Sequence, residues 1–84
     1  MPTQYRYALD QAADEAMSMM PRRDLRVLRD FFRFLAEHPN SVGEQQVLDD
    51  DGRRCEVKSH DRFVITYRAD HSAREVRIAA VELL

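Results

Sequence analysis

The sequence contains no tryptophan, only two glycines and a single cysteine. Because one cysteine cannot form an internal disulfide, we expect Cys55 to be a small buried side chain in a reducing compartment. No stretch reaches the roughly 20 apolar residues that a membrane-spanning helix needs. The first residues also lack the apolar segment of a signal peptide. These absences predict a cytoplasmic protein that makes no contact with a membrane.

Residues that bind metals and cofactors are also sparse. The three histidines and Cys55 lie far apart, without the short spacings that metal ligands usually show. The chain has no glycine-rich phosphate loop and no nucleophile elbow. We therefore expect no metal and no cofactor.

Charge is divided unevenly along the chain. The net charge is −2, which argues against a protein that coats nucleic acid non-specifically. Residues 1–50 are net negative, whereas residues 51–84 are net positive. A local basic patch can bind phosphate even on a slightly acidic molecule. The alternative is that these charges only keep the surface soluble.

Two helices are predicted in the N-terminal half, after a short strand over residues 4–9. Asp10 is a suitable N-cap for a first helix that runs to Met20, where the next residue, a proline, ends it. A second helix is predicted over residues 22–37, because apolar side chains recur there on one face. This apolar face consists of Leu25, Leu28, Phe31, Phe32 and Leu35, widened by Val27 and Phe34. The arginines outside it alternate with Asp24 and Asp30, which predicts a salt-bridged, solvated surface.

Three strands are predicted over residues 52–82, with a further short strand considered at 45–48. Side chains alternate between the two faces of a strand, so apolar positions two residues apart are assigned to the core. The positions assigned to the core in this way are Cys55, Val57, Ser59, Phe63, Ile65, Tyr67, Ala69, Val76, Ile78 and Ala80. The solvent face is then predicted to carry five basic residues: Arg54, Lys58, Arg62, Arg68 and Arg77.

These elements define an α+β fold of order β-α-α-β-β-β. Two helices are expected to pack on one face of a small, mainly antiparallel sheet, and the other face is left bare. At 84 residues the chain is long enough for one domain, which we expect to span residues 1–84.

Three segments of the chain carry a resemblance to a known family: LRVLRDFFRFLAEHPN, GRRCEVKSHDRFVITYRAD and VRIAAVE. In length and element order the chain resembles the RelE/ParE superfamily of toxins from type II toxin–antitoxin modules. The third strand of these toxins often reads aromatic–Arg–apolar–apolar–Tyr, and the segment from Phe63 to Tyr67 is similar to it. The resemblance covers nearly the whole chain. It implies a RelE/ParE-like fold and an antitoxin protein as partner.

RelE-like members are ribosome-dependent mRNA endonucleases, and the resemblance implies where such a site would lie. It matches Lys58 to a basic residue of the family, with Glu56 or His60 as the base that accepts the 2′-hydroxyl proton. Phosphate contacts are assigned to Arg54, Arg62, Arg68 and Arg77. Two departures count against cleavage. Val64 replaces the family's arginine, and residues 81–84 lack the basic, Tyr or His side chains found near the family's C-terminus.

Three functions therefore remain open. The chain is a RelE-type endoribonuclease, a non-enzymatic ParE-type binder of DNA gyrase, or a catalytically eroded member that binds only a partner. We expect an antitoxin to pack an acidic amphipathic helix across the helices and the basic sheet face. The ribosome and mRNA are partners only in the first case. Leu83 and Leu84 either pack at the edge of the core or form a dimer contact, so the oligomeric state stays open.

Overall fold

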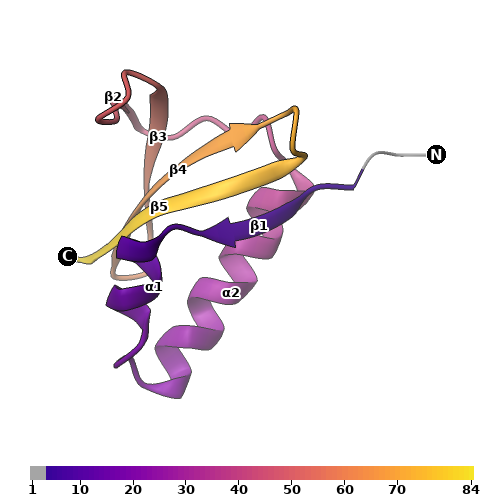
Figure 1. The fold of residues 1–84 in the computed structure, drawn as a ribbon. Helices are drawn as coiled ribbons and strands as arrows, with labels where there is room; N and C mark the ends of the chain where they lie inside the picture. Colours follow the sequence, from indigo (N-terminus) through magenta and orange to yellow (C-terminus); the bar gives the residue numbers. More distant parts are fainter. Residues whose placement is uncertain (1–3) are drawn as a thin grey trace.

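The computed structural model describes residues 4–84, which form two helices and one five-stranded sheet. In chain order the elements are β1 (Arg6–Leu9), α1 (Gln11–Met17), α2 (Arg22–Glu37), β2 (Gln45–Leu48), β3 (Arg54–His60), β4 (Phe63–Asp70) and β5 (Glu75–Leu83). The strands lie in the order β1-β5-β4-β3-β2, as Figure 1 shows. Within residues 4–84 the β1–β5 pair is parallel and the other three pairs are antiparallel. The predicted α+β fold with a mainly antiparallel sheet is confirmed, and β2 adds one strand to the predicted order.

The helices follow from local sequence to different degrees. The predicted bounds of α2, residues 22–37, are confirmed. The apolar stripe of this helix packs on the sheet and buries Leu28, Phe32 and Leu35. The first helix is shorter than predicted and ends at Met17. Asp10 flanks α1 but its side chain makes no capping hydrogen bond. Its carboxylate instead accepts a 2.9 Å hydrogen bond from Nε of Arg77.

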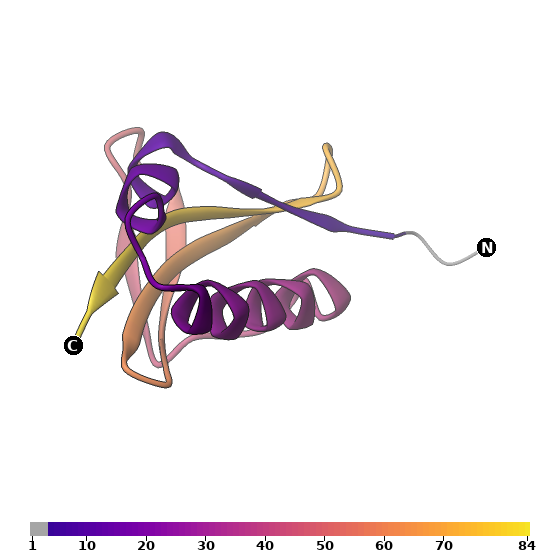
Figure 2. The same cartoon turned by 90° about the horizontal axis from the view of Figure 1, so that it is seen from below.

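One core joins the two helices to one face of the sheet. Figure 2 shows α2 lying along a single side of the strands. Buried residues from both helices, β4 and β5 form this core: Ala13, Met17, Leu28, Phe31, Phe32, Leu35, Phe63, Ile65, Tyr67, Val76, Ile78 and Val81. At about 25 cal/mol per Å² of buried apolar area, such clusters supply most of the folding free energy of a small domain.

An irregularity in β5 changes which residues reach the core. Tyr67 pairs with Ile78, whereas Thr66 pairs with Ala80, so Ala79 has no opposite residue. This bulge reverses the alternation of the strand. As a result Val81, and not Ala80, is buried beside Ile65. The prediction that Ala80 faces the core was therefore wrong.

No helix within residues 4–84 is both long and apolar enough to cross a membrane.

Candidate functional site

The faces of β3 are the reverse of those predicted. Lys58 lies directly opposite Ile65, and His60 lies opposite Phe63. Because directly opposed residues of antiparallel strands share a face, Lys58 and His60 lie on the same side of the sheet as the core. The assignment of Cys55 and Val57 to that side was wrong. These two residues belong to the outer face, which is the face of the sheet opposite the helices.

The five basic residues do not gather on one surface, which corrects the predicted basic face. Arg54 and Lys58 lie on the helix side of β3, and Arg62 lies in the turn between β3 and β4. Arg68 and Arg77 oppose each other on the outer face. The nucleic-acid contacts expected of these residues would therefore have to come from three separate regions.

All four arginines among these five residues form ion pairs with carboxylates, and Arg54 pairs with Glu56. Arg62 donates a 2.6 Å hydrogen bond to Asp24, which is only 4% exposed. Arg77 is bonded to Asp10 and to Glu75. The hydrogen bond from Arg77 to Asp10, with a smaller effect of Glu75, raises the already high pKa of Arg77. The pairing of Asp24 also corrects the expectation that this residue is part of the solvated surface of α2.

The side chains of Arg68 and Cys55 lie on the outer face and are largely shielded from solvent. The guanidinium of Arg68 lies 3.9 Å from the carboxylate of Asp49, and its side chain is 16% exposed. Cys55 is buried, as predicted, but it is not part of the main core. Burial is the main cause of the raised pKa of its thiol, which keeps the sulfur protonated and unreactive at neutral pH.

A shallow hollow lies between α2 and β3, on the helix side of the sheet. We call it the α2–β3 hollow. It has a volume of about 390 Å³ and is lined by Asp30, Phe31, Phe34, Lys58 and His60. Phe34 is 44% exposed there, although the sequence predicted that it would widen the buried stripe. No carboxylate within residues 4–84 forms an ion pair with Lys58. The hollow therefore combines an open aromatic ring with an unpaired cation.

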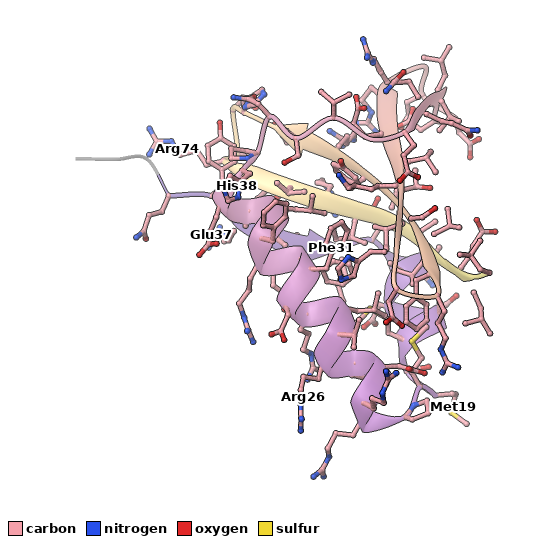
Figure 3. All side chains as sticks on the ribbon, turned by 180° about the vertical axis from the view of Figure 1, so that it is seen from behind. Met19, Arg26, Phe31, Glu37, His38 and Arg74 are labelled. Atoms are coloured by element: carbon pink, nitrogen blue, oxygen red, sulfur yellow. The ribbon has the colours of Figure 1, made fainter. Side chains whose placement is uncertain are left out.

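Four stacked rings run from β3 to the end of α2. The His60 and Phe31 rings are nearly parallel, with centroids 4.1 Å apart. Phe31 stacks on Phe34 at 6.3 Å, and Phe34 stacks on His38 at 4.4 Å. Figure 3 shows Phe31 directed from α2 toward the strands. This row of stacked rings holds the imidazole of His60 at the wall of the hollow.

The carboxylate of Glu56 is occupied by hydrogen bonds within the fold. Its carboxylate accepts 2.9 Å hydrogen bonds from Nε2 of Gln46 and from the backbone N–H of Gly43. The bond from Gln46 is the main reason that its pKa is lowered, followed in the same direction by Gly43 and Arg54. A carboxylate with a lowered pKa is a weaker proton acceptor, so Glu56 is poorly suited to act as a general base.

Tyr67 lies opposite Glu56 and lines a second hollow, which also contains Arg54 and His71. Its hydroxyl donates a 3.3 Å hydrogen bond to the carbonyl oxygen of Ser41. Burial, with a smaller effect of Glu56 and Glu44, raises its pKa to about 12. Tyr67 thus stays protonated at neutral pH and ties the loop after α2 to the sheet.

The sequence interpretation missed the aromatic part of the site. Phe31 was assigned to the core and is buried there, whereas Phe34 was also assigned to the core but is exposed. The signal that distinguishes Phe34 from the buried stripe is angular: at 100° per residue, Phe34 lies about 160° from Phe32 around the helix axis. Within residues 4–84, no three His, Cys, Asp or Glu side chains gather closely enough to hold a metal ion.

Comparison with known proteins identifies the fold. No family model matches the sequence, and no curated protein matches it. Among solved structures, a chain of the toxin–antitoxin complex RelBE2 from Mycobacterium tuberculosis is similar, with a TM-score of 0.77 and 19% identity. This match covers 98% of the present chain and 100% of the other. A chain of the archaeal RelE–RelB complex from Pyrococcus horikoshii has a TM-score of 0.73 and 12% identity, and the match covers 96% of each chain.

Proposed function

We propose that this chain, which has the fold of the RelE toxins, is the toxin-like component of a bacterial type II toxin–antitoxin module. We further propose that it acts by binding other proteins and not by cleaving RNA. The fold likeness supports this assignment, because it extends over nearly the whole of both chains. The proposed partner is a cognate antitoxin, since both similar structures are toxin–antitoxin complexes.

The α2–β3 hollow is the proposed docking site for the antitoxin. The exposed ring of Phe34 beside an unpaired cation suits an amphipathic segment that inserts an apolar side chain and places a carboxylate near Lys58. Phe34 supplies the apolar contact area, and His60 forms the wall. The acidic amphipathic helix expected from the sequence has this chemistry.

RNA cleavage of the RelE type is the second candidate. One observation favours it: Lys58 and His60 line the same hollow, so a cation and a proton acceptor are close together. The separation of Arg54, Arg62, Arg68 and Arg77 counts against it, because a phosphate in the hollow would not meet them together. We therefore place the protein-binding function first and keep ribosome-bound mRNA as the alternative target.

The decisive experiment is co-expression with the protein encoded by the adjacent reading frame. A stable complex is expected, and Phe34→Ser or Lys58→Glu should weaken it by about tenfold or more, as for residues at the centre of an interface. Met19→Ser is the matched control, because Met19 is 90% exposed and lies outside the hollow. If no complex forms, or if all three variants bind equally, the proposed docking site is wrong.

Growth arrest and primer extension separate the two candidates. Induction without the partner should arrest growth, and ribosome-bound message should remain uncut. Codon-positioned cuts that disappear in both Lys58→Ala and His60→Ala would instead establish the nuclease.

A further inference from the structure

The outer surface of α2 carries a row of arginines that the proposed docking site does not use. Arg22, Arg26, Arg29 and Arg33 are all exposed and recur every three or four residues. At 100° and 1.5 Å per residue they fall within an arc of about 60° and extend over about 16 Å. We call this row the arginine stripe. Figure 3 shows Arg26 pointing away from the sheet.

Of the two acidic residues that appeared to neutralise this row, the structure leaves only Asp30 beside it. Asp24 is buried and paired with Arg62 and Arg23, so it does not reach the stripe. Asp30 forms a 2.9 Å ion pair with Arg33 at one end of the stripe. Within residues 4–84, Arg22, Arg26 and Arg29 form no ion pair. Asp14 lines a small hollow together with Arg29 but is not bonded to it.

These observations distinguish two kinds of anionic partner. A protein interface needs an apolar centre, and affinity from exposed charge pairs alone is small. The stripe contains no apolar residue, and the exposed Phe34 lies about 100° away from it around the helix. Nucleic acid has no such requirement, because its phosphate backbone is bound by cations alone and counterions are released on binding. Arginine is also well suited to phosphate, because its planar guanidinium forms bidentate hydrogen bonds.

We propose that the arginine stripe of α2 binds the phosphate backbone of nucleic acid, on a surface separate from the α2–β3 hollow. The contact is electrostatic and independent of base sequence, because no exposed aromatic or amide side chain lies among the four arginines. It does not depend on the toxin-like function. A chain that binds no antitoxin can still bind phosphate through this helix.

The test is fluorescence anisotropy with two labelled probes, a short single-stranded RNA and a short DNA duplex of mixed sequence. The double variant Arg26→Gln/Arg29→Gln should bind about tenfold or more weakly than the unaltered chain. The slope of log affinity against log salt should also fall by about 1.4 on the single strand and about 1.8 on the duplex, the values for two lost phosphate contacts. The probe that binds more tightly identifies the source of the phosphate.

The matched control is Arg6→Gln/Arg74→Gln, which makes the same change in net charge at exposed residues outside α2. Circular dichroism should show all three proteins to be folded. The control should retain binding and its salt slope. Equal loss in both double variants would reduce the effect to net charge and overturn the proposal, as would the absence of binding to either probe. Displacement of bound RNA by a poly-glutamate peptide of equal charge would overturn it in favour of an acidic protein.

Discussion

The imidazole of His60 lies against the ring of Phe31, with centroids 4.1 Å apart and planes 9° from parallel. This contact joins the end of β3 to the middle of α2, and it forms one wall of the α2–β3 hollow. His60, which the sequence suggested only as a candidate base, is therefore also an element of tertiary packing. Its position also requires β3 to turn its charged side chains toward the helix.

The stack should contribute measurably to stability. A double-mutant cycle of His60→Ala and Phe31→Leu should give a coupling energy of about 0.5–1.5 kcal/mol, the range for paired rings beyond their buried area. Urea unfolding of the four proteins measures it. A cycle of Lys58→Ala with Phe31→Leu is the control and should show less coupling, because Lys58 has no ring to stack. Additive effects of His60 and Phe31 would show that the contact contributes nothing.

The buried carboxylate of Asp24 should depend on its arginine partner. Removing the guanidinium in Arg62→Ala leaves the Asp24 charge buried with a poorer partner. Because the Arg62 side chain is 54% exposed, solvent screens part of the effect, and the expected loss is about 1–2 kcal/mol. Arg54→Ala, which breaks an exposed pair with Glu56, should cost less than about 1 kcal/mol. Equal midpoints in chemical denaturation for the two variants would contradict this.

Acid should weaken the anchoring of β2 through Glu56. The pKa of Glu56 is lowered from its ordinary value of 4.5, chiefly by the hydrogen bond from Gln46. A group with a lowered folded-state pKa stabilises the fold above its unfolded pKa, and this contribution is lost as the pH falls through the folded pKa. Glu56→Gln should therefore flatten the fall in unfolding free energy below about pH 4.5. Asp61→Asn is the control, since Asp61 makes no side-chain hydrogen bond within residues 4–84, and its acid limb should match that of the unaltered chain.

Gly43 should tolerate no side chain. A Cβ atom there would lie 2.5 Å from the backbone oxygen of Val57 and 2.7 Å from its nitrogen. Since both atoms belong to a paired strand, the loop must move, and Gly43→Ala should cost about 1–3 kcal/mol as an overpacked site. Gly52→Asn is the control, because Gly52 has a φ of +79° with open space around it, and asparagine accepts that conformation. Hydrogen exchange should show β2 unprotected only in the first variant, and protection in both would contradict the clash.

The sequence predicted α2 well because its evidence is local. Leu28, Phe32 and Leu35 recur with the helical period, and a single helix has only one such stripe. The faces of β3 could not be predicted in the same way. Alternation groups Lys58 with His60, and Cys55 with Val57, but it does not say which group faces the helices. Hydrophobicity suggested the second group, whereas the register with β4 selects the first.

The sequence by itself determined the order of the elements and the bounds of α2, because hydrophobic periodicity acts over a few neighbouring residues. The likeness to the RelE toxins came from the resemblance of three segments to that family. The tertiary structure alone decided that Lys58 and His60 meet Phe31 and Phe34 in one hollow. It also decided that Asp24 turns inward, and that Arg22, Arg26 and Arg29 of α2 form no ion pair within residues 4–84. Each of these facts depends on strand register and long-range ion pairs, which join residues far apart in the chain.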